Sequence, residues 1–170
     1  MRLMRRALFT MSVAVLAAAL AYADGVEVRV RQTPGGPMIH VDGKPVPPRF
    51  FFGTSHDAST IGHCRDAGVR FISFVAPSCW GDPAAGDQWD GVDRIFDQII
   101  AVHPEALLVP RVYMNALRWL LEKHPDWNMR FSDGKDRKVA SVCAHEYREL
   151  AAAHLEKLVR HLREKYPNNF

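Results

Sequence analysis

Three short apolar runs, each followed by a segment of helical character, constrain this chain more than any other feature. The runs lie at residues 49–53, 69–75 and 106–112. Strands that alternate with helices along a chain form a parallel sheet with right-handed crossovers. Three such units match the start of an eightfold (β/α) barrel, which needs about 250 residues. We therefore predict an α/β fold in which residues 49–170 form a partial (β/α)8 TIM barrel of three βα units. A flavodoxin-like doubly wound sheet, usually of five strands, is the alternative.

The residues before the first apolar run have the pattern of a β-hairpin. Val26–Val30 alternates apolar and charged side chains, as a half-exposed strand does. Thr33–Gly36 is a turn sequence, and Met38–Val41 is the return strand. Asp42–Gly43 is typical of another tight turn. We predict an N-terminal β-hairpin over residues 24–48.

The central part of the chain has recognisable strand and helix signals. Phe50–Phe52 is apolar throughout, which predicts a strand buried on both faces. A short helix is expected over residues 59–67, with Gly68 as its C-terminal stop. Apolar side chains spaced three, one and three residues apart over Val92–Ile99 predict an amphipathic helix. Trp89, at the start of that helix, is expected to be a packing residue.

The C-terminal third begins with a segment that we predict to be long and irregular, starting after residue 112. It contains Trp127, which we expect to pack rather than to bind a ligand. A final helix then runs to Pro167, and its predicted buried stripe is Leu155, Leu158, Val159, Leu162 and Tyr166.

Residues 1–23 have the organisation of a secretory signal peptide. Three arginines precede an apolar run over residues 7–20, and Ala21–Ala23 is a small-x-small cleavage site. The apolar run is shorter than the roughly 20 residues that a membrane-spanning helix needs. We predict cleavage after Ala23 and a secreted or periplasmic protein that has no membrane contact afterwards. The full chain has 22 basic and 19 acidic residues. Three of the basic residues lie in the signal, so the remaining chain has 19 of each. This balance does not indicate nucleic-acid binding.

No cofactor or metal site is expected from the sequence. Cys64, Cys79 and Cys143 allow at most one disulfide and leave a free thiol, and we favour buried structural thiols. No cysteine or histidine spacing is typical of a metal site, and the sequence lacks a phosphate-binding loop, a dinucleotide fingerprint and a G-x-S-x-G motif.

Polar and aromatic side chains cluster after the predicted strands. The segment ALLVPRVYMNALRWL, residues 106–120, begins as a buried strand and then presents a guanidinium, a phenol, an amide and an indole. Carboxyl ends of parallel strands meet at one edge of the sheet, so this pattern predicts the rim of a polar-ligand site. The candidate site residues are His56, Asp57, Trp80, Arg111, Tyr113, Asn115 and Trp119. The structural alternatives are that Arg111 pairs with a carboxylate inside the barrel and that Trp80 and Trp119 anchor loops.

An ordered series of motifs resembles a known family. The series is Asp42–Pro45, Ala67–Val69, Trp89–Asp93, Pro110–Tyr113 with Trp119, His124–Asp126 and Asp133–Gly134. Together these motifs resemble the barrel domain of secreted β-galactosidase-like glycoside hydrolases, relatives of glycoside hydrolase family 42 in the clan of retaining barrel glycosidases. The resemblance extends from about residue 37 onward. Leu117 stands where such proteins usually have a proline.

The resemblance implies an exported enzyme that hydrolyses O-glycosidic bonds, with a carbohydrate substrate as its partner. The candidate residues would then bind sugar hydroxyls, and the tryptophans would face the sugar ring. In this clan the acid/base glutamate follows the fourth strand and the nucleophile follows the seventh, so we expect no catalytic residue in this chain. The alternative is a noncatalytic carbohydrate-binding or structural remnant that is complete at residue 170. The oligomeric state stays open.

Overall fold

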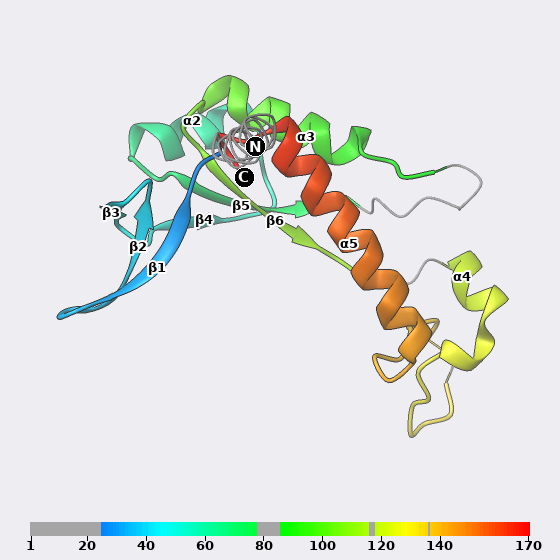
Figure 1. Cartoon of the computed structure of the whole chain (residues 1–170). Helices are drawn as coiled ribbons and strands as arrows, with labels where there is room; N and C mark the ends of the chain where they lie inside the picture. Colours follow the sequence, from blue (N-terminus) through cyan, green and yellow to red (C-terminus); the bar gives the residue numbers. More distant parts are fainter. Residues whose placement is uncertain (1–24, 78–85, 116–117, 136) are drawn as a thin grey trace, which may run out of the picture.

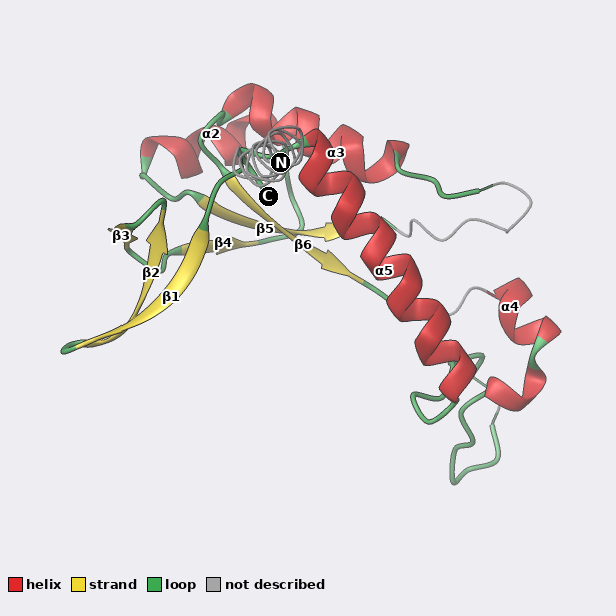
Figure 2. Cartoon of the chain, in the orientation of Figure 1, coloured by secondary structure: helices red, strands yellow, loops and turns green. Residues whose placement is uncertain are grey.

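A computed structural model describes residues 25–77, 86–115, 118–135 and 137–170. The predicted signal peptide, Cys79 and Trp80 lie outside these residues. Figures 1 and 2 show the strands of two small sheets on one side and the longer helices beside them. The elements in chain order are β1 (Val28–Thr33), β2 (Gly36–Val41), β3 (Lys44–Val46), β4 (Phe50–Phe52), α2 (Ala58–Asp66), β5 (Phe71–Ala76), α3 (Asp90–Val102), β6 (Leu107–Val112), α4 (Arg118–Lys123), the 3-10 helix η1 (Pro125–Trp127) and α5 (His145–Lys165). None of the described helices is long and apolar enough to cross a membrane.

The N-terminal sheet is antiparallel and has the order β1-β2-β3. The predicted hairpin was incomplete, because Lys44–Val46 turns back and pairs with β2 as a third strand. Asp42 and Gly43 make this possible: their φ angles are 49° and 77°, which a tight turn between antiparallel strands requires. Pairing begins at Val28, opposite Val41, two residues later than the alternation predicted.

The second sheet is parallel, with the order β4-β5-β6, as the strand–helix alternation predicted. A flavodoxin-like sheet would place its first strand between the second and the third, but β5 is the central strand here. Helices α2, α3 and α5 all contribute to one core with the same face of this sheet. No barrel closure is seen among the described residues.

The helix predictions were largely correct. Helix α3 begins at Asp90 and ends at Val102, and it buries the expected apolar positions. Helix α2 ends just before Gly68, whose φ of 68° is the left-handed conformation expected of a C-terminal stop. The predicted stripe of α5 was wrong at Leu155, which is exposed. The buried side is set by the sheet and by α3, and it instead includes Tyr147 and His154 with Leu158 and Leu162.

The expectation that β4 is buried on both faces was wrong. Phe51 packs against the helical core, but Phe50 is 47% exposed and Phe52 is 71% exposed. The reason is that successive strand side chains point to opposite faces, and helices cover only one face. The N-terminal sheet covers part of the other face, where Phe71 and Leu107 pack with Val41. The rest of that face is not covered by any described element, and Phe52 is exposed there.

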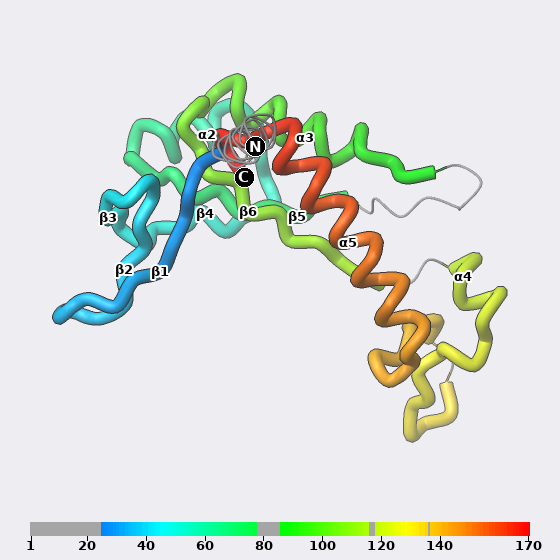
Figure 3. Tube along the Cα trace, viewed as in Figure 1, coloured from blue at the N-terminus to red at the C-terminus, as the bar shows by residue number. Residues whose placement is uncertain are grey.

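The two ends of the described chain lie together beside the parallel sheet (Figure 3). Val26 N–H donates to the Pro167 carbonyl at 2.7 Å, and Leu108 N–H donates to the Asn169 carbonyl at 2.7 Å. The Asn169 amide also donates to the carbonyls of Pro104 and Ala106 at 2.9 and 2.8 Å. The C-terminal residues are therefore fastened to the start of β6.

The segment between β6 and α5 is more ordered than predicted. It contains α4 and η1, and Figure 1 shows it at the far end of α5 from the N-terminal sheet. Leu120, Leu121, Trp127, Ala140 and Tyr147 form a small separate core there. Burial of Trp127 confirms its predicted packing role, and this second core explains why the segment has helices of its own.

Candidate functional site

Arg111, near the carboxyl end of β6, is the centre of the candidate site. Register places it opposite Val75 of β5, and its side chain reaches across the sheet to β4. Arg111 Nη2 donates to the Gly53 carbonyl at 2.5 Å, and the guanidinium carbon lies 3.9 Å from the centre of the Phe52 ring. The guanidinium thus ties the carboxyl ends of β4 and β6 together across the open face of the sheet.

The charge of Arg111 has no anionic partner within the described part of the chain. Its contacts are a neutral carbonyl and an aromatic ring, and its Nε is buried without an acceptor. Arginine stays protonated in proteins, so this charge is permanent. A buried donor without an acceptor costs about 1–3 kcal/mol, which an oxygen of a ligand or of another chain segment would recover. The predicted pairing with a carboxylate is not formed within the described residues.

Asp57 is occupied as the N-cap of α2. Its carboxylate accepts hydrogen bonds from Thr60 N–H at 3.0 Å, from the Thr60 hydroxyl at 2.8 Å and from the Ser55 hydroxyl. These bonds, that from Ser55 above all, hold the pKa of Asp57 well below its ordinary value. His56 lies beside it and is half-buried. The structure thus gives Asp57 a capping role, and its predicted sugar contact stays a prediction.

The other predicted site residues lie in two places. Tyr113, which is 60% exposed, and Asn115, also exposed, follow the carboxyl end of β6 within three residues. Trp119 instead packs against the small core around Leu120, and its Nε1 is buried with no acceptor among the described residues. Trp80 lies outside the described residues. Sequence reasoning missed Phe52, although its alternation with Phe51 was the signal that it faces away from the helices.

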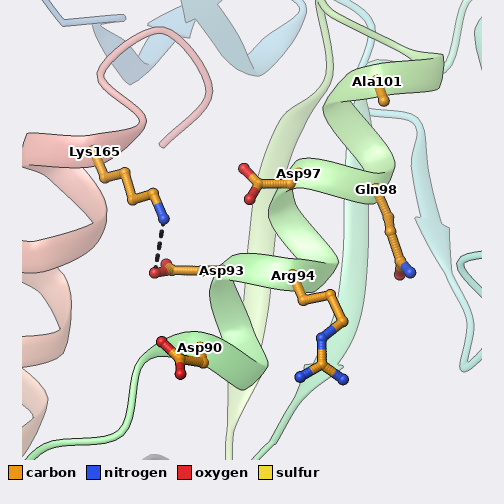
Figure 4. A pocket seen from close by; sticks show the side chains of 7 residues that line it. All are labelled: Asp90, Asp93, Arg94, Asp97, Gln98, Ala101 and Lys165. Atoms are coloured by element: carbon orange, nitrogen blue, oxygen red, sulfur yellow. Dashed lines mark hydrogen bonds and ion pairs between the residues drawn. The ribbon is translucent and has the colours of Figure 1, made fainter.

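A second polar region lies on the helical side, between α3 and the end of α5 (Figure 4). It is an open cavity of about 550 Å³, and Asp90, Asp93 and Asp97 line it on one side with Lys165 opposite. His161 Nε2 and Lys165 Nζ donate to the Asp93 carboxylate at 2.8 and 2.9 Å. The Tyr166 hydroxyl donates to Asp97 at 3.0 Å. The carboxylates of Asp93 and Asp97 already have partners on α5 or directly after it, so the region joins two helices.

The pKa values in this region follow from the same contacts. Burial raises the pKa of Asp93, but the hydrogen bonds and charges of Lys165 and His161 outweigh it and lower the pKa below its ordinary value. The hydrogen bond to Asp93 raises the pKa of Lys165. Burial, then the hydrogen bond to Asp97, raises the pKa of Tyr166. Each pKa shift favours the protonation state that forms the contact between the helices: charged for Asp93 and Lys165, neutral for Tyr166.

Trp89 has the predicted packing role. Its ring stacks against His154 and His161, at centroid distances of 5.6 and 5.2 Å. The two histidines are seven residues apart and share one face of α5. They are packing residues of the α3–α5 contact.

The cysteines follow the prediction only in part. Cys64 is a buried free thiol, and burial raises its pKa. Cys143 is also free but exposed, which contradicts the expectation that it is buried. Within the described ranges, no group of three or more His, Cys, Asp or Glu side chains is arranged to hold a metal ion.

Comparison with known proteins gives no further assignment: the chain matches no protein-family model and no curated protein. The role of the region around Arg111 therefore has to follow from the chemistry of the residues found there. A permanently charged donor, an aromatic face and the exposed phenol and amide after β6 can bind and orient a polar ligand.

Proposed function

We propose that this chain is the N-terminal part of an exported (β/α)8-barrel glycoside hydrolase, acting on β-galactosides or related glycans. In this proposal residues 49–170 supply the first three βα units, and the catalytic glutamate pair comes from later strands. The observation that carries it is the half-covered parallel sheet, with Arg111 at its carboxyl edge.

The open face of the sheet is the strongest support for a larger barrel. Phe52 and Val109 are 71% and 39% exposed there, while the opposite face packs against three helices. A sheet needs a second layer on each apolar face. In a barrel this face is the interior, which is filled by side chains of all the strands. The consecutive strand order and the placement of every packed helix on one face agree with that arrangement.

The contacts of Asn169 also support continuation of the sheet. The Leu108 N–H bonded to the Asn169 carbonyl is a donor of the β6 edge that faces away from β5. A fourth parallel strand would pair with this edge. Phe170, the next residue, packs against the helical core.

The position of the described glutamates agrees with a binding role for this part of the barrel. Retaining glycosidases need two carboxyl groups about 5–5.5 Å apart at the substrate. Glu105 precedes β6 and so lies at the amino end of the sheet. The remaining glutamates of the C-terminal half that the structure describes belong to α4 and α5, namely Glu122, Glu146, Glu149, Glu156 and Glu164. We infer that this segment contributes hydroxyl-binding groups, with Arg111, Tyr113 and Asn115 at the carboxyl edge.

The first test is to sequence the source DNA beyond the codon for Phe170. The proposal expects an open frame with a strand-like run and then Asn-Glu within about 20 residues, because the acid/base glutamate of this clan follows the fourth strand and a strand spans about 3–10 residues. The extended protein should hydrolyse a chromogenic β-galactoside. Arg111→Met should lower kcat/KM about 100-fold, because a charge-assisted contact to substrate is lost.

The matched control is Arg160→Met, which removes an exposed guanidinium from α5 whose ion pair is with Glu156. It should leave kcat/KM unchanged. A stop codon directly after Phe170 would exclude the barrel mechanism and favour the noncatalytic carbohydrate-binding protein. An extended enzyme whose kcat/KM is insensitive to Arg111→Met would remove Arg111 from the site.

A further inference from the structure

A second cleft lies away from Arg111, between α4, η1 and the first turns of α5. Its volume is about 600 Å³, within the range usual for small-molecule sites. Tyr147 of α5 forms part of the core beneath it, and the Tyr147 hydroxyl donates to the Met114 carbonyl. This bond ties α5 to the segment that leads from β6 into α4, so the walls of the cleft are held by packing on both sides.

Aromatic rings form the floor and one wall of the cleft. Trp127 is only 7% exposed, and the His124 ring stacks on it at 3.9 Å with an interplanar angle of 9°. Trp119 and Leu150 add half-buried and exposed apolar surface. Trp127 lies beneath the His124 ring, so the apolar groups that a ligand can contact are the half-buried Trp119 and His124 rings and Leu150. Aromatic rings of this kind pack well against the C–H face of a sugar.

Three charged side chains line the same cleft. They are Lys123, Asp126 and Glu146, and none forms an ion pair or hydrogen bond with another side chain in the described residues. One donor and two acceptor groups therefore face solvent beside an apolar surface. One positive and two negative side chains give the cleft a small negative net charge. The cleft therefore disfavours phosphate and other anions. The chemistry fits a neutral ligand that combines hydroxyl groups with an apolar face.

We propose that this cleft is an accessory sugar-binding site, which takes a pyranose ring of a neutral glycan. The ring stacks on the aromatic surface, and its hydroxyls bond to Asp126, Glu146 and Lys123. The preference for a galactoside rests on the proposed function, whereas sugar binding as such rests on the cleft.

The location of the cleft fits a role beside the main site. Trp119 follows Arg111 by eight residues, so their backbones are at most about 29 Å apart at full extension. Both belong to the chain that leaves the carboxyl end of β6. If one oligosaccharide contacts both Arg111 and the cleft, linking the two contacts increases its affinity.

The test is a titration of the full chain, labelled with ¹⁵N, with a β-1,4-linked galacto-oligosaccharide, monitored through the indole N–H signals. Trp119→Phe and Trp127→Phe assign the two relevant signals. We expect both signals to shift with a millimolar Kd, and Glu146→Gln or His124→Ala to weaken binding about tenfold. Glu149→Gln, on the same helix but outside the cleft, is the matched control and should bind as the wild type does.

Three results would overturn the proposal: no shift of these signals at the solubility limit of the sugar, an equal shift with glycerol at matched hydroxyl concentration, or unchanged binding by Glu146→Gln and His124→Ala. Glu146→Gln changes an exposed side chain, so it keeps the test valid even if His124→Ala unfolds. The Arg111→Met variant separates the two proposals. Shifts that persist in Arg111→Met support the cleft even if no hydrolase is found, and hydrolysis without shifts removes only the cleft.

Discussion

Asp93 joins α3 to α5, and its replacement by asparagine gives the sharpest test of this contact. The side chain is 12% exposed and accepts hydrogen bonds from His161 and Lys165 at 2.8 and 2.9 Å. Asparagine has nearly the same shape, but it loses the charge and can accept only one of the two bonds well. The substitution therefore removes an electrostatic contact without leaving a cavity.

The expected loss follows from the exposure of each partner. A hydrogen bond to a buried charged group contributes about 1.5–3 kcal/mol, and this applies to His161, whose side chain is 24% exposed. Lys165 is 45% exposed, so solvent screens its contribution and His161 provides the larger share. Asparagine retains part of one bond. We expect the free energy of unfolding at pH 7 to fall by about 2 kcal/mol, which lowers Tm by about 4–8 °C for a chain of this size.

The pH dependence has a definite sign. The pKa of Asp93 is lowered in the folded protein, so its stabilisation is present above the unfolded pKa of about 3.9 and is lost as the pH falls through the folded value. The raised pKa of Lys165 means that its part is present below about 10.4 and is lost only at strongly alkaline pH. The difference between wild type and Asp93→Asn should therefore narrow between about pH 5 and pH 3.

Urea unfolding followed by far-ultraviolet circular dichroism measures this difference at each pH. The slope m should stay the same, because the same surface is exposed on unfolding. Arg160→Met, which breaks only an exposed pair with Glu156, is the control and should cost less than about 0.5 kcal/mol. A loss for Asp93→Asn that is equally small, or one that is as large at pH 3 as at pH 7, would refute the reasoning.

Three further predictions concern the core and the thiols. Asn169→Ala leaves the carbonyls of residues 104 and 106 without their side-chain donor. It should lower the free energy of unfolding by about 2 kcal/mol in the same urea assay. An unchanged free energy of unfolding would mean that the C-terminal residues are not fastened to β6. Leu158→Ala, at a site that is 1% exposed, should cost about 2–5 kcal/mol, whereas Leu155→Ala, at a site that is 39% exposed, should cost less than about 1 kcal/mol; equal costs would contradict the orientation of α5. Cys143 should react with a maleimide in the native protein and Cys64 only after unfolding, as peptide mass spectrometry can show; native labelling of Cys64 would contradict its burial.

The elements with a strong local signal were predictable from sequence. The apolar spacing of Val92–Ile99 predicted α3, and Gly68 marked the end of α2. Both signals are local, because helical periodicity and left-handed φ depend on neighbouring residues. Alternation of strands and helices likewise predicted a parallel sheet.

The candidate site was predictable only as a set of residues near the strand ends. Arg111 lies at the expected edge, but its contacts with Phe52 and Gly53 join residues about 58 positions apart, and no local pattern contains them. Asp57 is the opposite case, because its role could have been predicted from neighbouring residues. Its N-cap role follows from Thr60 three residues later, a local signal that the search for a site passed over.

The sequence by itself determined the positions of α2, α3 and the strands of the parallel sheet, because backbone preference and apolar periodicity are properties of short segments. Tertiary structure decided which side of β4 and of α5 is buried. Phe50–Phe52 is apolar throughout, yet only Phe51 reaches the helical core. Leu155 belongs to the apolar pattern of α5, yet it faces solvent. Burial depends on which neighbours pack against an element, and those neighbours come from distant parts of the chain.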